Sequence, residues 1–194
     1  MANLFHSGTL QAMNSQRFAA TLAVALGALS CNACALDWTP RGAFVIAGVA
    51  SHRTDSLSAG LVWPWSWRRE ALGGELTGLT EGYASYWRAH AASERRSFTQ
   101  IGVVPLVRYR FSQGRSDWFA EAGIGVSLMD RLYRTNDRQF STSFNFVDVA
   151  GAGRSFGAQR QHELGLRLVH ISNAGIKHPN PGENFLQLRY AAMF

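Results

Sequence analysis

Long apolar runs are missing from this sequence, and charged residues are few. A transmembrane helix needs about 20 consecutive apolar residues, whereas the longest apolar stretch covers only residues 18–30. Charged residues make up 16% of the chain, well below the roughly 25% of soluble domains. Proline is also scarce, yet there are 19 glycines and six tryptophans, a mixture that excludes disorder, collagen and coiled coil. These features favour an all-β protein, and a β-barrel in lipid fits them best.

Lysine is nearly absent as well. Lys177 accompanies 18 arginines, and against 13 acidic residues these 19 basic residues give a net charge of +6. Proteins that bind nucleic acid usually gather their basic residues in one patch, but here the arginines are spread along the chain and often alternate with apolar residues. This spread disfavours a nucleic-acid partner. It suits the lumen of a barrel or the phosphate groups of lipids at its rim.

Cysteine is confined to an N-terminal segment that we expect to be removed. Arg17 precedes the apolar run, and an A-x-A cleavage site with Cys34 at its centre follows it. This arrangement predicts a signal peptide over residues 1–35. A lipoprotein attached through Cys31 is disfavoured, because the residues before it match the lipid-attachment pattern poorly.

The mature domain is expected to cover residues 36–194, and translation can begin at Met1 or Met13. This domain contains no cysteine, so disulfides cannot stabilise it. A closed ladder of strands in lipid does so instead, because every backbone polar group is then paired.

Alternation of apolar and polar residues with a period of two predicts the strands. Between residues 57 and 68, for example, Leu57, Leu61 and Trp63 share one parity, while Ser58 and Arg68 share the other. Turn-like clusters separate eight such segments, and many are longer than soluble strands usually are. The expected strands are 41–50, 57–68, 74–88, 97–111, 117–128, 143–157, 161–173 and 184–194. The predicted fold is an eight-stranded antiparallel transmembrane β-barrel.

The C-terminus separates this fold from a soluble barrel of lipocalin type, whose apolar face would point inward. Alternate apolar residues from Leu186 onward end in Phe194, and this ending resembles the terminal signature of bacterial outer-membrane proteins. We therefore expect a multi-pass barrel in the bacterial cell outer membrane. With both termini periplasmic, residues 174–183 form the last outer loop.

Two polar residues continue the lipid-facing parity of the seventh strand. Leu164, Leu166 and Leu168 are expected to face lipid, and His170 and Ser172 follow at the same parity. An imidazole close to a hydroxyl can activate serine as a nucleophile. The alternative is that both side chains bind lipid head groups or loop backbone.

Residues 170–183 read HISNAGIKHPNPGE, and this stretch closely resembles the motif of the lipid A 3-O-deacylase (PagL) family. Looser similarity covers residues 119–126 and 145–148. The resemblance implies an eight-stranded outer-membrane barrel that is a carboxylic ester hydrolase. It further implies lipopolysaccharide as partner and substrate, with cleavage of the acyl ester at position 3 of lipid A in the outer leaflet of the outer membrane.

The resemblance also implies roles for individual residues. Ser172 would be the nucleophile and His170 the general base. Backbone N–H groups near Asn173 and Gly175, together with Asn180, would stabilise the oxyanion. Turn formation is an equal alternative role for Asn173 and Gly175.

Three further residues are candidates for the substrate groove. Lys177 would meet a lipid A phosphate or remain a solvated loop residue. Phe146 and Asp148 would shape the groove or serve ordinary strand packing.

The third member of the catalytic group is where this sequence departs from the family. Ungapped alignment puts Asn184 at the family's acidic position, and Glu183 lies one residue earlier. We expect Glu183 to complete a Ser-His-acid group through a one-residue shift of the loop. Asn184 is the alternative, since an asparagine can orient a histidine but brings no charge to stabilise the imidazolium.

Other chemistry has little support in the sequence. The remaining histidines show no metal-ligand spacing, and no phosphate-binding glycine loop is present, so we expect no metal and no cofactor. Two other functions stay open: a non-enzymatic barrel with a structural or adhesion role, and an acyltransferase acting on lipid A. A homodimer is also compatible with the sequence.

Overall fold

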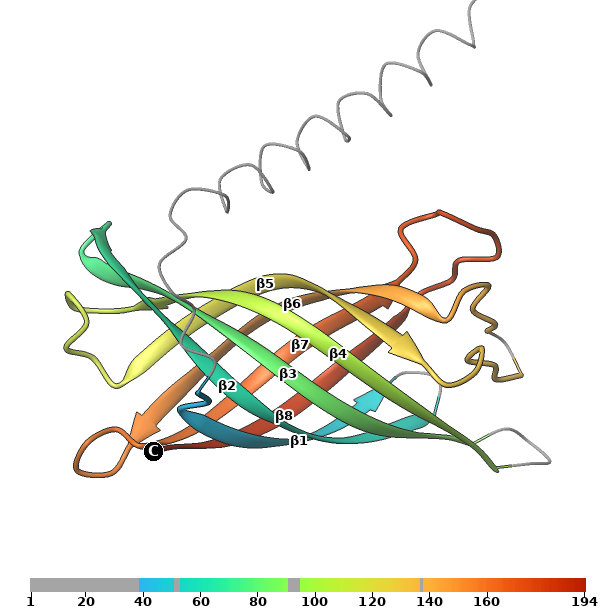
Figure 1. Cartoon of the computed structure of the whole chain (residues 1–194), viewed down its shortest axis with the longest axis horizontal. Helices are drawn as coiled ribbons and strands as arrows, with labels where there is room; N and C mark the ends of the chain where they lie inside the picture. Colours follow the sequence, from blue (N-terminus) through green and yellow to red (C-terminus); the bar gives the residue numbers. More distant parts are fainter. Residues whose placement is uncertain (1–38, 51–52, 91–94, 137) are drawn as a thin grey trace, which may run out of the picture. The chain divides into compact units, whose positions relative to one another are not determined.

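The computed structural model describes residues 39–50, 53–90, 95–136 and 138–194, which form a closed barrel of eight antiparallel strands (Figure 1). The strands are β1 (Gly42–Ala50), β2 (Thr54–Ala71), β3 (Gly74–His90), β4 (Arg95–Arg110), β5 (Trp118–Met129), β6 (Phe144–Phe156), β7 (His162–Ser172) and β8 (Glu183–Met193). The expected signal peptide, both start codons and both cysteines lie outside the described residues. No helix in the described ranges is long and apolar enough to cross a membrane.

Every strand pairs with the next one, and β1 closes the barrel against β8. Gly42 lies opposite Met193, and the Phe194 N–H donates to the Arg41 carbonyl at 2.9 Å. The prediction of an eight-stranded antiparallel barrel is confirmed. Seven of the eight expected segments match the strands to within a few residues at each end, whereas β2 is longer than expected, with three more residues at each end.

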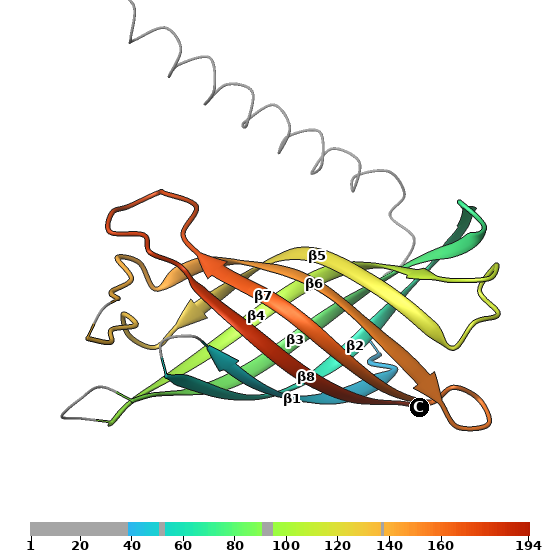
Figure 2. The ribbon, with the colours of Figure 1, turned by 180° about the vertical axis from the view of Figure 1, so that it is seen from behind.

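The two ends of the barrel differ in their connections (Figures 1 and 2). One end carries turns, and the tightest of them is Leu72–Gly73, where φ is 52° and 74°, as the preferred two-residue hairpin turns require. The other end carries the longer connections 130–143 and 173–182. Short turns at the periplasmic end and longer loops at the outer end are the usual asymmetry of outer-membrane barrels.

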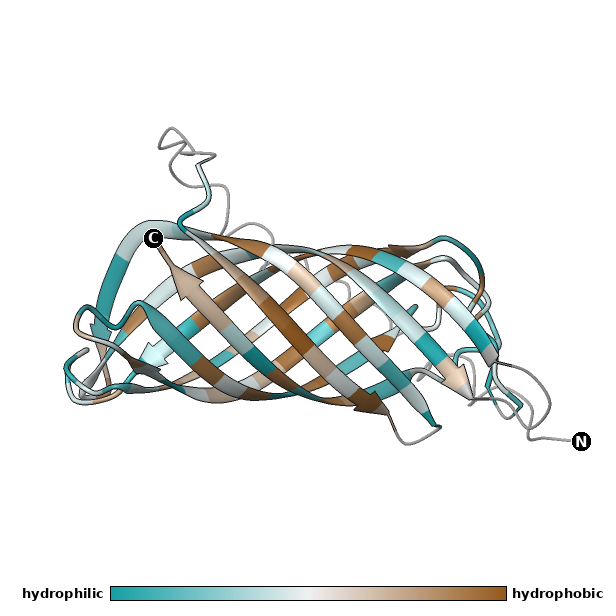
Figure 3. Ribbon diagram, turned by 90° about the horizontal axis from the view of Figure 1, so that it is seen from below, coloured by the Kyte–Doolittle hydropathy of each residue, from teal (hydrophilic) through white to brown (hydrophobic). Residues whose placement is uncertain are grey.

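Hydrophobic and hydrophilic residues alternate along the strands (Figure 3), and large apolar side chains are exposed on the outer wall of the barrel. On β7, Leu164, Leu166 and Leu168 are 48%, 56% and 66% exposed, whereas Arg167 is 3% exposed. The predicted facing of this strand is therefore confirmed. The same alternation on the other strands produces a continuous apolar outer face, which requires lipid rather than water around it.

Arginines and glutamates form a closed ring across the lumen. Each arginine contacts two glutamates and each glutamate contacts two arginines, so the charges balance. The contacts are Arg108 with Glu121 at 2.9 Å and Glu163 at 2.5 Å, Arg167 with Glu81 and Glu121 at 2.6 Å each, and Arg189 with Glu81 at 2.8 Å and Glu163 at 3.0 Å. The alternation of arginine with apolar residues thus places these arginines in the lumen, as expected.

The loop end of the lumen is apolar, in contrast to the ring of charges. Trp87, Tyr133 and Phe185 pack edge to face with ring centroids 4.6–5.5 Å apart, and Phe98 and Phe140 contact the same tyrosine. An eight-stranded barrel is only wide enough for its side chains to fill. Outside the ring of charges, apolar side chains and hydrogen-bonded polar ones such as Gln100 and Ser127 therefore fill the lumen.

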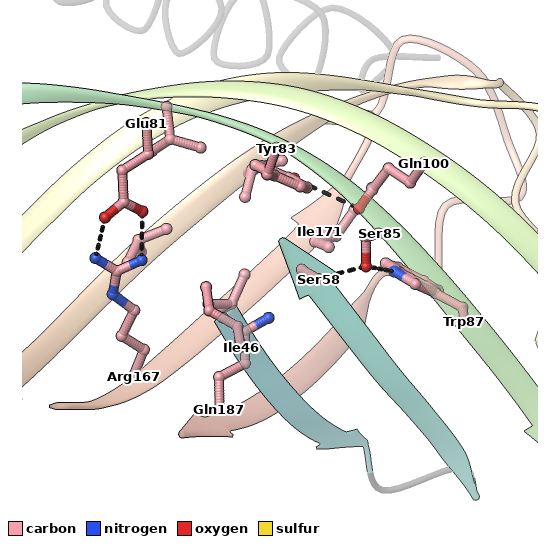
Figure 4. Close-up of a pocket in the computed structure, with 14 residues that line it drawn as sticks. Ile46, Ser58, Glu81, Tyr83, Ser85, Trp87, Gln100, Arg167, Ile171 and Gln187 are labelled. Atoms are coloured by element: carbon pink, nitrogen blue, oxygen red, sulfur yellow. Dashed lines mark hydrogen bonds and ion pairs between the residues drawn. The ribbon is translucent and has the colours of Figure 1, made fainter. Parts of the chain in front are cut away.

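A cavity of about 30 Å³ is left inside the lumen. Figure 4 shows Glu81 bonded to Arg167 on one side of it, and Ser85 bonded to Ser58 and Trp87 on another. This volume accommodates a water-sized molecule. It cannot admit a lipid, so a lipid substrate has to bind elsewhere on the barrel.

Candidate active site

His170 and Ser172 lie at the end of β7 next to the long loops, on the outward face. Cross-strand pairing sets their neighbours: Asp148 of β6 and Asn184 of β8 flank His170, and Phe146 of β6 lies opposite Ser172. Directly opposite residues on one face are close enough for their side chains to interact. The structure therefore brings five residues from three strands together at the lipid-facing rim.

The imidazole of His170 is oriented by a hydrogen bond to Asn184. His170 Nδ1 and Asn184 Oδ1 lie 2.7 Å apart. An amide oxygen can only accept a hydrogen bond, so Nδ1 is the donor, and in the neutral imidazole Nε2 then carries the lone pair. This is the tautomer in which Nε2 can act as a general base.

Glu183 points into the lumen, away from His170. Its side chain is fully buried, and its Oε2 accepts a hydrogen bond of 3.0 Å from the hydroxyl of Tyr133. Burial raises the pKa of the Tyr133 phenol, and the Glu183 carboxylate raises it further, so the phenol stays protonated and donates. Successive side chains of a strand face opposite sides. Our preference for Glu183 as the neighbour of His170 is therefore wrong, and Asn184 occupies that position.

The loop after β7 begins with a tight turn beside Ser172. The Ile176 N–H donates to the Asn173 carbonyl at 3.0 Å, and φ is positive at both central residues, Ala174 and Gly175. The Ala174 N–H points at Ser172 Oγ from 3.4 Å. Ala174 thus presents a backbone donor to the hydroxyl.

Asn173 is the centre of this loop, and it is nearly inaccessible to solvent. Its N–H donates to Asn180 Oδ1 at 3.0 Å, and its Oδ1 accepts from the Gly175 N–H at 3.0 Å. Its Nδ2 donates to Ser141 Oγ and to the Lys177 carbonyl, at 3.0 and 2.8 Å. Of the expected oxyanion donors, the N–H groups of Asn173 and Gly175 are thus engaged within the loop, in the turn role that the sequence also allowed.

A second loop holds this segment in place. From residues 130–143, Arg138 donates through Nη1 to the carbonyls of Pro181 and Gly182, at 2.7 and 2.6 Å, and Ser141 donates to the Lys177 carbonyl at 2.7 Å. Neither residue could be recognised from the sequence, because each lies more than thirty positions from its partners. The loop also contains a cis peptide bond before Pro179.

Gly182 packs directly against the catalytic histidine candidate. A Cβ atom added there would lie 2.6 Å from Cε1 and 3.1 Å from Nε2 of His170. The absence of a side chain therefore allows the loop to approach the edge of the ring that carries the free nitrogen.

Taken together, the rim brings the Ser172 hydroxyl, an oriented imidazole and a backbone donor to the outward side of β7, where Ser172 itself is buried and only 8% exposed. Among the described residues, no group of three His, Cys, Asp or Glu is placed to hold a metal ion. A hydroxyl and a basic imidazole at the surface of a lipid-facing barrel are suited to acyl transfer from a lipid ester.

Comparison with known proteins assigns the family. The family model described as Lipid A 3-O-deacylase (PagL) matches residues 56–192. The chain belongs to this family. The resemblance read from residues 170–183 is thereby confirmed, and it extends over nearly the whole barrel.

Individual PagL proteins agree with this assignment. The lipid A deacylase PagL of Pseudomonas aeruginosa is 35% identical over 133 residues, which are 68% of this chain and 73% of that protein. PagL of Bordetella bronchiseptica is 30% identical over 169 residues, 86% of this chain and 91% of that protein. A crystal structure of the outer membrane enzyme PagL superposes with a TM-score of 0.67 at 30% identity, covering 79% of this chain and 99% of that one. The barrel is thus that of the PagL outer-membrane proteins.

Proposed function

We propose that this protein is a lipid A 3-O-deacylase, which hydrolyses the acyl ester at position 3 of lipid A in the outer leaflet. The observation that carries the proposal is the position of His170 and Ser172. In a chain of the PagL family, these two residues share one face of β7, two positions apart, at the end of the barrel with the longer loops, and this supports the proposal.

Ser172 is the nucleophile in the proposed mechanism. Its Oγ attacks the ester carbonyl while His170 Nε2 takes its proton, and the ester C–O bond to the sugar then breaks as His170 protonates the sugar oxygen. Water, deprotonated by the same imidazole, hydrolyses the acyl-serine and releases a free 3-hydroxy fatty acid. The Ala174 N–H, which lies 3.4 Å from Ser172 Oγ, is the proposed donor for the developing oxyanion. Such a donor contributes about 2.7–4 kcal/mol in serine hydrolases.

Asn184 acts as the residue that orients the base. By accepting from Nδ1–H it fixes the tautomer, but its neutral amide gives the imidazolium no counter-charge. Asp148 lies on the other side of His170 and is the nearest carboxylate candidate on the lipid-facing side. With Phe146, it forms the wall of the proposed substrate groove, whereas Lys177 is exposed on the loop.

Mass spectrometry of lipid A tests the function. Lipid A from cells that express the protein should lose one 3-hydroxyacyl chain, whereas cells expressing Ser172→Ala at equal levels should keep it. Unchanged lipid A with the folded protein in the outer membrane would refute the proposal. A gain in acyl mass would indicate an acyltransferase instead.

A further inference from the structure

A second and larger cavity lies among the loops at the same end of the barrel. Its volume is about 510 Å³, and it is lined by Arg96 from the start of β4, Arg134 and Arg138 from the loop 130–143, and Pro179 and Pro181 from the loop after β7. The cavity is therefore formed by three separate segments of the chain. The proposed reaction uses none of its lining side chains.

Among the lining residues that the structure describes are three guanidinium groups and no carboxylate. Arg134 is exposed, and its guanidinium has no ion-pair partner within the part of the chain that the structure describes. A guanidinium offers several N–H donors in a fixed plane, a geometry that matches the oxygens of phosphate. The concentration of positive charge in one concave site thus favours an anion.

The cavity is connected to the catalytic residues by one short segment. Arg138, which lines the cavity, holds the carbonyls of Pro181 and Gly182, and Gly182 contacts the ring of His170. A lipid whose ester reaches Ser172 from the membrane side therefore places its polar head group near these loops.

We propose that this arginine cavity binds a phosphate group of the lipid A head group and so positions the 3-acyl ester at Ser172. The inference rests on the proposed function and adds the feature by which the enzyme selects a phosphorylated glycolipid. Other anions of lipopolysaccharide, such as the carboxylates of acidic core sugars, share this chemistry, and the choice of substrate separates the two sources.

The kinetic test compares purified lipid A with the same lipid A after enzymatic removal of its phosphates. The double variant Arg96→Gln/Arg134→Gln should raise KM for phosphorylated lipid A by about tenfold, the effect of losing a charge-assisted hydrogen bond, and leave kcat unchanged. KM for the dephosphorylated lipid should be equal in wild type and variant. Arg131→Gln is the matched control, because Arg131 lies on the same loop, pairs with Asp130 at 3.1 Å and does not line the cavity.

Two results would overturn the proposal: an equal rise in KM for both lipids, or no rise for either. A rise that appears only with complete lipopolysaccharide, and not with lipid A, would assign the cavity to core carboxylates and would also overturn it.

A binding measurement makes the outcome independent of turnover. The Ser172→Ala protein should bind phosphorylated lipid A in detergent micelles, inorganic phosphate should compete, and the added Arg96→Gln/Arg134→Gln changes should weaken binding by a similar factor. If the wild type hydrolyses neither lipid, the proposed function fails, while this binding still decides the cavity. Equal binding of both lipids would exclude a phosphate site.

Discussion

At the scale of single residues, the contact between Asn184 and His170 has the most direct kinetic consequence. Asn184→Ala removes the acceptor of the Nδ1 proton, so kcat should fall by about tenfold, the effect of one lost hydrogen bond. Asn184→Glu should raise kcat above wild type, because a carboxylate stabilises the imidazolium. Ester release from purified lipopolysaccharide in detergent measures both changes.

Glu183→Ala is the control for this prediction. Its carboxylate bonds Tyr133 inside the lumen, so the variant should be destabilised by about 1–3 kcal/mol while retaining kcat at temperatures where it is folded. A large loss of kcat in folded Glu183→Ala, with none in Asn184→Ala, would restore the Ser-His-acid arrangement expected from the sequence.

Gly182 offers a second test at this scale. Gly182→Ala places a methyl group against His170, and a misplacement of about 1 Å in a reacting group lowers the rate by roughly 100-fold. Gly175→Ala is a matched control, because Gly175 also has a positive φ, of 80°, but its added Cβ would meet nothing within 4 Å. Equal activity of the two folded variants would contradict the proposed role of the His170 ring.

The facing of His170 and Ser172 was predictable from sequence because parity is a local property of a strand. The residue that lies beside His170 was harder to predict, because a loop of uncertain length precedes it and a shift of one residue reverses the face. A signal was nevertheless present. Asn184 shares its parity with Leu186 and Leu188, so the residue on the lipid face with His170 had to be Asn184.

At the scale of elements, β7 carries both the proposed catalytic residues and a row of outward-facing leucines. Leu166→Arg puts a charge on the lipid face and should lower the free energy of unfolding in lipid vesicles by about 2–4 kcal/mol near the midplane. Leu166→Ala removes similar apolar contacts without the charge, and it should cost clearly less. Urea titration of both variants measures the difference, and tolerance of Leu166→Arg would refute the facing of the whole strand.

The length of the β2–β3 hairpin could not be predicted from the alternation of apolar and polar residues alone. Pairing beyond Val62 involves only β3 and contains a bulge between Pro64 and Arg68. Trp63 and Trp65 lie over Gly82 and Gly78 of β3, and Trp65 donates to Thr80 at 2.9 Å. The rings fill the space that the glycines leave open. Pairing with β3 then continues to Ala71 opposite Gly74, three residues past the end of the strand that alternation defined.

At the scale of the whole molecule, the lumen ring should dominate stability. Arg167→Met leaves Glu81 and Glu121 each with one arginine fewer, and breaking such a buried pair is destabilising by about 3–5 kcal/mol. Arg154→Met is the control, since its 3.6 Å contact with Asp117 is largely exposed, and it should change stability by less than about 1 kcal/mol. Similar urea midpoints for the two variants would show that the ring does not stabilise the barrel.

The sequence placed arginines in the lumen but could not pair them with their glutamates. The partners of Arg189 lie 108 and 26 positions away, and only the register of eight strands and the closure of β1 on β8 bring them together. The arginine cavity could not be predicted from the sequence for the same reason. It is formed by loops whose approach depends on the completed barrel.

The outward parity of His170 and Ser172 changes what substrate concentration means under the proposed function. Because the lumen cavity is too small for a lipid, the proposed mechanism requires the substrate to arrive by diffusion within the leaflet and both products to be released into the same plane. Turnover in mixed micelles should therefore follow the mole fraction of lipid A at the surface, and adding inert detergent at constant bulk lipid A should slow it. The rate would then depend on the concentration of lipid A within the membrane, rather than on its concentration in the aqueous phase.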